Sequence, residues 1–125
     1  MQRLFNKCLF FIYIFVSLFA ATNHAAACQY GHCWNAVAVG PNWVSGYATD
    51  RATAPDAAAL ALSACGQECQ SVEVFDGGCG TIATSRDGAI YFGSGATRQA
   101  ASQGAIASCQ ALDNSCVSRV TACSR

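Results

Sequence analysis

Nine cysteines occur in this 125-residue chain, and their number and placement restrict the fold more than any other feature. Cys8 falls in an apolar N-terminal stretch, so eight cysteines belong to the rest of the chain. An even number of cysteines in a small exported chain indicates a framework of disulfides. Such bonds stabilise a domain whose hydrophobic core is small. The eight are Cys28, Cys33, Cys65, Cys69, Cys79, Cys109, Cys116 and Cys123.

Residues 1–27 have the three parts of a secretory signal peptide. Two basic residues begin the segment, residues 4–21 are almost wholly apolar, and residues 25–27 are small alanines of the kind found at cleavage sites. We therefore expect cleavage before Cys28 and a secreted or periplasmic protein that no longer touches a membrane. Two alternatives remain open. The apolar run is close to the shortest length that spans a bilayer, and Cys28 could be lipidated, which would leave an odd number of cysteines for pairing.

The remaining segment, residues 28–125, has the size of one domain. It contains no lysine, and its five arginines and seven acidic residues give a formal charge of −2. A nearly neutral surface without a basic stripe argues against nucleic acid as a partner. No second long apolar run follows, so we expect this segment to be soluble. Nothing in it predicts a cofactor.

Two copies of one unit make up this segment, at residues 34–77 and 79–123. Each copy has a short apolar strand pattern and then an alanine-rich run that ends in a cysteine. The matching segments are residues 35–39 with 80–84, and residues 57–65 with 101–109. Chance similarity between alanine-rich segments is the alternative explanation. A threonine before each run and the closing cysteine favour duplication.

The repeat favours one pairing of the eight cysteines, although sequence alone leaves other connectivities open. Each alanine-rich run ends in a cysteine that is soon followed by another, so we expect a local bond at equivalent places in the two copies. The favoured bonds are Cys28–Cys33, Cys65–Cys69, Cys79–Cys123 and Cys109–Cys116. A metal site around His32 and the cysteines is the competing interpretation. Export and a lone histidine in this segment argue against it, so we expect no metal.

Each copy predicts two strands, a helix and a third strand, which gives an α+β fold with antiparallel sheets and two alanine-rich helices. Turn compositions, Gly40-Pro41-Asn42 and Asp87-Gly88, separate the first two strands of each copy. Thr53 is placed to cap the first helix, in whose first turn Pro55 causes no steric conflict. The expected strands are residues 36–39, 43–47, 72–75, 81–84, 89–92 and 117–122, and the expected helices begin near residues 53 and 97.

Several of these motifs occur together in one known family. They are the strand Asn35-Ala36-Val37-Ala38, the alanine-rich helix that ends in a cysteine, and the step Cys79-Gly80-Thr81-Ile82-Ala83. In this combination the chain resembles DUF4189, a domain of unknown function from exported bacterial proteins. The resemblance covers residues 34–123 and implies this fold and export, but it implies no activity. The N-terminal pair Cys28 and Cys33 is not part of the family pattern.

No catalytic set is evident in residues 28–125, and we expect no catalytic residue. Nucleophilic catalysis needs a nucleophile, a base and an orienting group, and His32 is the one histidine of this segment. We interpret His32 as an exposed loop residue and Asp76 as a turn residue. Glu73 alternates with two valines that we expect to face the core, so it is predicted to face solvent.

Aromatic residues are the remaining candidates for a functional surface. Trp43 and Tyr47 in the first predicted hairpin correspond to Tyr91 and Phe92 in the second, and Trp34 follows the N-terminal cysteine pair. Ordinary packing of these rings is one interpretation. The other is a binding surface formed by Trp34, Trp43, Tyr47 and Tyr91, because exposed aromatic side chains are favoured at interfaces.

The sequence therefore favours an exported disulfide-rich domain that binds an unknown protein or a cell-envelope ligand without catalysis, as inhibitors and immunity proteins do. Two alternatives belong to other classes. One is a small secreted hydrolase that uses His32 or a pair of acids. The other is a secreted effector that acts on a host.

Overall fold

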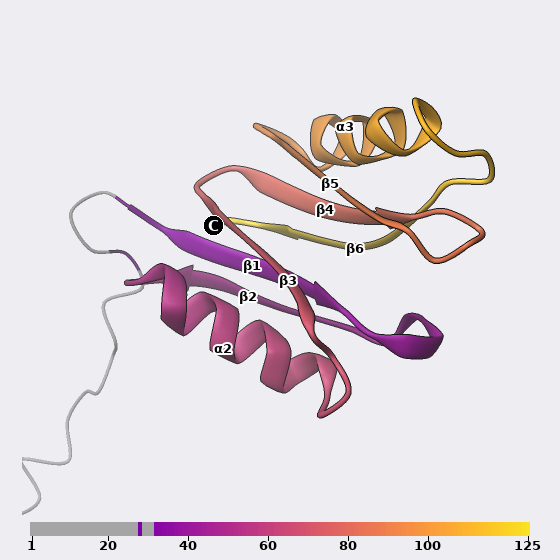
Figure 1. Ribbon diagram of the computed structural model, residues 1–125. Helices are drawn as coiled ribbons and strands as arrows, with labels where there is room; N and C mark the ends of the chain where they lie inside the picture. Colours follow the sequence, from indigo (N-terminus) through magenta and orange to yellow (C-terminus); the bar gives the residue numbers. More distant parts are fainter. Residues whose placement is uncertain (1–27, 29–31) are drawn as a thin grey trace, which may run out of the picture.

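The order strand, strand, helix, strand occurs twice in the computed structural model, which describes Cys28 and residues 32–125 (Figure 1). The first half consists of β1 (Trp34–Val39), the 3-10 turn η1 (Pro41–Trp43), β2 (Ser45–Arg51), α2 (Ala54–Cys65) and β3 (Ser71–Asp76). The second half consists of β4 (Cys79–Thr84), β5 (Ile90–Gly95), α3 (Arg98–Gln110) and β6 (Val117–Cys123). The predicted α+β class is confirmed, and the shared order of elements agrees with the predicted duplication. The predicted signal peptide, residues 1–27, lies outside the described residues.

Each half forms its own antiparallel sheet of three strands, with the first strand of the unit in the centre. The strand orders are β2-β1-β3 and β5-β4-β6. The hairpins have the same register, because Val39 lies opposite Ser45 and Thr84 lies opposite Ile90. All predicted strands and helices begin within two residues of the observed starts.

Trp43 differs most from the prediction, since it lies in η1 and not in a strand. The strand that we expected from Trp43 begins at Ser45. In the shared register Tyr47 is the counterpart of Phe92, because they lie opposite Val37 and Ile82, respectively. Trp43 therefore has no counterpart in β5. Trp43 lies outside the strands because the turn of each hairpin is five residues long, and in the first hairpin it consists of residues 40–44.

The two sheets pack face to face, and a helix covers the outer face of each (Figure 1). Val37 and Val39 of β1 meet Ile82 of β4 between the sheets. The inner cluster is Val37, Val39, Phe75, Ile82 and Ala122, with Phe92 and Val120 packed against it. Beneath α2 the buried residues are small: Ala36, Ala38, Ala48, Ala57, Ala61, Cys65 and Cys69. Small side chains let the helix lie close to the sheet, but each buries little apolar area.

Both helices begin with a threonine cap. The Thr53 hydroxyl accepts a hydrogen bond from the Asp56 N–H at 3.3 Å, and the Thr97 hydroxyl accepts one from the Ala100 N–H at 3.1 Å. These bonds satisfy amide groups that have no partner within the helix. The predicted cap of α2 is confirmed, and Gly66 ends this helix with a φ of 124°.

All four predicted cysteine pairs are formed. Cys79–Cys123 joins β4 to β6 at directly opposite positions in the sheet. Cys65–Cys69 and Cys109–Cys116 join the end of each helix to the loop that follows it. Disulfides persist in oxidising compartments outside the cytoplasm. Within the described residues, no helix is both long and apolar enough to cross a membrane.

The sandwich is closed along one side and open along the other. Strand β6 packs along β1 and β2, whereas β3 meets the second sheet mainly through Phe75, whose ring lies against Gly80 of β4, and β5 has few contacts with the first sheet. Phe75 of β3 and Phe92 of β5 still meet, with ring centroids 6.0 Å apart. Glu73 is exposed, as predicted, but it lies opposite Val37 and so faces the space between the sheets. The two valines beside it face α2 instead.

Candidate functional site

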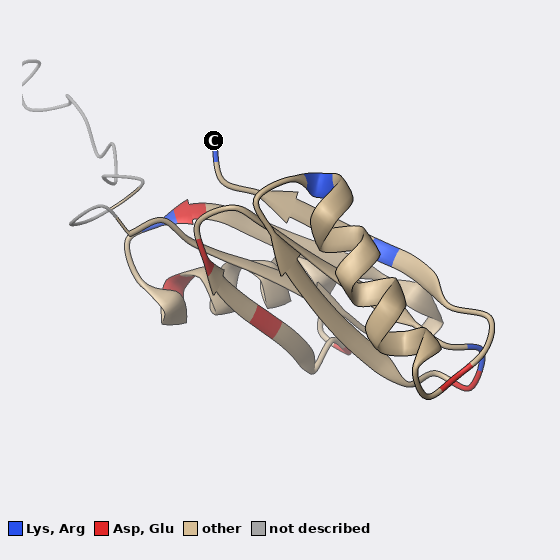
Figure 2. Ribbon diagram, turned by 90° about the horizontal axis from the view of Figure 1, so that it is seen from above, with Lys and Arg blue, Asp and Glu red and all other residues tan. Residues whose placement is uncertain are grey.

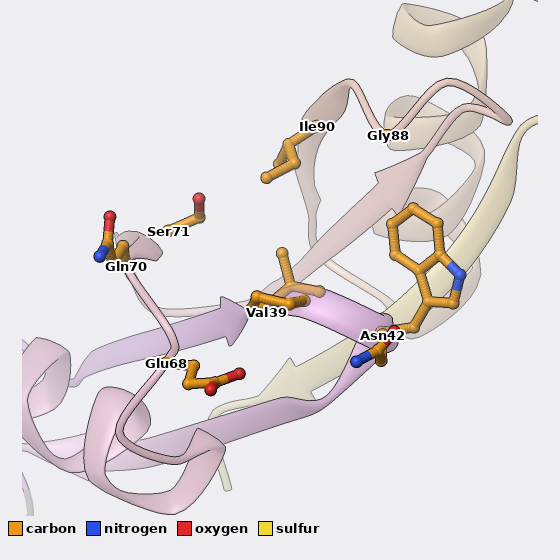
Figure 3. Close-up of a pocket in the computed structure, with 10 residues that line it drawn as sticks. Val39, Asn42, Glu68, Gln70, Ser71, Gly88 and Ile90 are labelled. Carbon is orange, nitrogen blue, oxygen red and sulfur yellow. The ribbon is translucent and has the colours of Figure 1, made fainter.

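A groove of about 440 Å³ lies where the two sheets part (Figure 3). Residues 40–43, the turn that includes η1, form one wall, and Val39 lies beside them. Glu68 and Gln70 come from the loop before β3, and Gly88 comes from the β4–β5 turn. Ser71 and Ile90, which begin β3 and β5, complete the lining. Three connections from both halves of the chain therefore meet around one opening.

The wall formed by η1 has an unusual backbone. Asn42 and Trp43 both have a left-handed conformation, with φ of 56° and 62°. The equivalent turn in the second half places Gly88, with φ of 88°, where the first half has Trp43. A bulky L-residue pays roughly 1–2 kcal/mol for this conformation, whereas glycine does not. Backbone strain of this kind concentrates at functional sites.

Packing across the two halves holds the Trp43 ring in place. The Arg119 guanidinium carbon of β6 lies 4.2 Å from the centroid of the indole. Arg119 Nε also donates a hydrogen bond of 2.8 Å to the hydroxyl of Thr84, which is fully buried. The indole thus has a fixed cationic neighbour while 40% of the residue stays exposed.

The wall opposite η1 is held by a disulfide. Glu68 and Gln70 flank Cys69, whose bond to Cys65 fixes this loop to the end of α2. A Cβ at Gly40 would lie 2.6 Å from the Cys69 sulfur, so the disulfide packs directly against the start of the η1 wall. Glu68 is the one ionisable side chain among the residues that line the groove.

Comparison with known proteins covers the same part of the chain. A family model described as "Domain of unknown function (DUF4189)" matches residues 34–123. The chain belongs to the DUF4189 family. It is similar to the NMR structure of Rv1813c from Mycobacterium tuberculosis, with 30% identity, a TM-score of 0.55, and coverage of 76% of this chain and 77% of that chain. No curated protein matches.

A second group of polar residues in this DUF4189 domain lies near the N-terminal disulfide. His32 Nδ1 is 2.5 Å from the Asp76 carboxylate, whose other oxygen accepts a hydrogen bond of 3.2 Å from the Cys33 N–H. The His32 ring also stacks on Trp34. His32 is exposed, as expected, but its carboxylate partner was not foreseen, because Asp76 ends β3 and 44 residues separate the pair. Among the described residues, no hydroxyl or thiol hydrogen-bonds to the other ring nitrogen.

A third group brings Cys28, Cys33 and Asp50 together at ligand distance. The two cysteines are bonded to each other, so their sulfur atoms are not thiolates. Thiolate is the form in which cysteine binds zinc. This group therefore offers one carboxylate, which already accepts a hydrogen bond from the backbone N–H of Arg125.

The four aromatic residues singled out from the sequence lie in different places. Trp43 lines the groove, whereas Trp34 packs against the residues beneath α2. Tyr47 is 59% exposed on the edge strand β2. Tyr91 donates a hydrogen bond to the Asp113 carboxylate beyond the end of α3, and this bond, together with burial and the negative charge, raises the pKa of Tyr91.

The groove also contains residues that sequence reasoning missed. Glu68 is not among the candidates from the sequence, and nothing in its local sequence places it in one groove with Trp43. One signal was available in the repeat. The two hairpin turns have the same length, and aligning them places Trp43 opposite Gly88. A tryptophan at a position where the other half has glycine indicates that this turn has a different role in the two halves.

Proposed function

We propose that this DUF4189 domain is an exported binding module that holds a protein or other cell-envelope ligand in the groove beside Trp43. The observation that carries the proposal is the strained conformation of Trp43, where the equivalent turn has glycine. An exposed, rigid indole buries a large area on binding and loses little conformational entropy. The groove provides polar side chains around this ring, which is the usual arrangement of a specific binding site.

Export is the second part of the proposal. Four disulfides in the described residues favour an oxidising compartment, and the first 27 residues have the pattern of a cleaved signal peptide. We therefore place the mature domain in the periplasm or outside the cell. An inhibitor or immunity protein acts by occupying another protein, and a rigid disulfide-bonded groove suits that task.

The proposal is tested by capture from an envelope extract with the immobilised domain, residues 28–125. Three forms are compared: wild type, Trp43→Ala, and Leu112→Ala, which removes a residue that is 79% exposed and does not line the groove. We expect one set of molecules to be retained by wild type and Leu112→Ala and lost with Trp43→Ala, as measured by quantitative mass spectrometry. Equal capture by all three forms, with unchanged melting temperatures, would contradict a role for the groove.

A secreted hydrolase is the second candidate, and the His32–Asp76 pair favours it. A carboxylate beside a histidine orients the ring and strengthens it as a base. The His32 side chain is 61% exposed. Its partner Asp76 ends β3, whereas the groove residue Ser71 begins this strand, so the pair lies away from the groove. Loss of a measured hydrolytic activity in His32→Ala, with capture unchanged, would favour this candidate over a binding module.

A further inference from the structure

We propose that the groove recognises an arginine side chain presented by an exposed segment of a partner protein. This inference rests on the proposed binding function and specifies the chemistry of its ligand. The ligand is assigned from three features of the described residues: the ionisable group in the groove, the aromatic ring beside it, and the distribution of charge over the two sides of the sandwich.

The groove offers the groups that a guanidinium requires. Glu68 supplies a carboxylate on one side of the groove, Asn42 lies across from it beside the tryptophan, and Gln70 lines the rim (Figure 3). Arginine carries five N–H donors in one plane, so it can bond to a carboxylate and to neighbouring oxygens together. Since no basic side chain lines the groove, an anionic ligand would meet Glu68 without compensation.

Trp43 suits the same ligand. Its indole already holds one guanidinium, that of Arg119, at 4.2 Å. Arg119 reaches the ring from β6 and is also bonded to Thr84, so it supports the indole from outside the groove lining. A stacked guanidinium is favourable on indole because the π-face is negative and the contact is flat. The charge of Arg119 opposes a second cation, and Glu68 offsets this repulsion from the other side of the groove.

Two carboxylates beside the groove favour a basic partner, and the nearby β4–β5 turn adds no net charge, because Arg86 is followed by Asp87. Glu73 lies two residues from Ser71 on the same face of β3, so a second carboxylate stands beyond Glu68 along the chain. Figure 2 shows how sparse the charged positions are along the ribbon. Arg98, in contrast, lies on the closed side, where it donates to the carbonyl of Thr121 on β6. Glu68 in the loop before β3 and Glu73 within β3 fit a chain segment better than a free small cation, because successive residues of a chain can reach both.

The test is a titration of the isotopically labelled domain, residues 28–125, followed by amide chemical shifts. The ligands are the blocked peptide Ala-Ala-Arg-Ala-Ala and its citrulline analogue, which has the same shape and no charge. We expect shifts at Gly40, Trp43, Ser71 and Gly88 with the arginine peptide, and affinity at least about fivefold weaker with citrulline. Raising the salt from about 20 to 300 mM should weaken only the arginine peptide.

Two acidic variants make the test specific. Glu68→Gln should weaken the arginine peptide about three- to fivefold and leave the citrulline peptide unchanged, because it removes one exposed charge pair. Asp56→Asn removes an exposed acid on α2, away from the groove, and should change neither. Equal affinity for the two peptides, or shifts that map elsewhere, would overturn the arginine assignment.

The two proposals fail in different ways. If the arginine peptide shows no preference while Trp43→Ala still abolishes capture from envelope extract, the groove binds a ligand of other chemistry and the arginine assignment is wrong. If Trp43→Ala leaves capture intact, the groove is not the binding site and both proposals are wrong.

Discussion

Two glycines determine how closely each helix approaches its sheet. A Cβ at Gly46 of β2 would lie 2.3 Å from the backbone nitrogen of Cys65, and a Cβ at Gly93 of β5 would lie 2.1 Å from that of Ala105. These neighbours are helix backbone, which cannot rotate away as a side chain can. Gly104 faces the same contact from within α3, yet a Cβ there would come no closer than 3.7 Å, to the Cα of Gly93.

Gly93 and Gly104, which lie on the two sides of the contact between β5 and α3, should therefore have opposite effects on stability when each is replaced by alanine. We expect Gly93→Ala to lower the free energy of unfolding by about 3 kcal/mol, because the helix must move away from the sheet. Gly104→Ala should raise it by about 0.5–1 kcal/mol, because alanine favours the helix and the added methyl has room. Urea unfolding of the oxidised domain measures both changes. A similar loss in both variants would show that the helix does not lie this close to β5.

At the scale of elements, Tyr91 joins β5 to the loop between α3 and β6 through its bond to Asp113. The phenol must keep its proton to donate this bond, and its pKa is raised first by the hydrogen bond and then by burial and the negative charge. A pKa that is higher in the folded protein stabilises the fold below the ordinary tyrosine pKa, about 10, and this contribution is lost as pH rises through the folded value.

We accordingly expect wild type to be more stable than Tyr91→Phe at neutral pH, and the difference to shrink as the pH rises above about 10. Denaturant unfolding curves of the two proteins at a series of alkaline pH values measure this difference in the free energy of unfolding. Asp113→Asn should move the pKa of Tyr91 back toward its ordinary value, which an NMR titration of the ring carbon would show. A stability difference that is constant through this range would mean that the bond does not form in solution.

The elements were largely predictable from the sequence, and the groove was not. Hydrophobic alternation, turn residues and threonine caps are local signals, so they located the strands and both helices. Trp43 was assigned to a strand because its own sequence is apolar, whereas the hydrogen bond from the Gly40 N–H to the Val44 carbonyl at 2.9 Å closes a turn around it. Glu68 and Trp43 line one groove only because three connections converge, and no local sequence pattern indicates such a convergence.

For the molecule as a whole, the difference between the two halves matters more than their likeness. The halves share strand order, hairpin register and capped helices, and these features build the sandwich. The first half has a tryptophan where the second has Gly88. In the first half, the disulfide from the end of the helix to the loop after it has a sequence separation of four, against seven in the second half, and it holds the short loop that contains Glu68 beside the turn. The first half thus supplies two walls of the groove, and the second half supplies the turn that completes it and the arginine that supports the Trp43 ring.

The stability of the whole domain should depend on the long-range disulfide more than on the local bonds. The cores beneath the helices consist mainly of alanine, so burial of apolar area contributes modestly. Cys79–Cys123 has a sequence separation of 44, and Cys109–Cys116 one of 7. If loop closure in the unfolded chain dominates, the longer bond stabilises by about 4 kcal/mol and the shorter by about 2.5 kcal/mol.

We therefore expect the double variant Cys79→Ala/Cys123→Ala to lose about 1.5 kcal/mol more than Cys109→Ala/Cys116→Ala in denaturant unfolding. Each double variant keeps an even number of cysteines, so no free thiol confuses the comparison. The fully reduced wild type should be largely unfolded at room temperature, as circular dichroism would show, because four such contributions together are comparable with the stability of a small domain. A reduced protein with an unchanged melting temperature would show that packing between the sheets suffices, and that the disulfides serve the geometry of the groove rather than the stability of the fold.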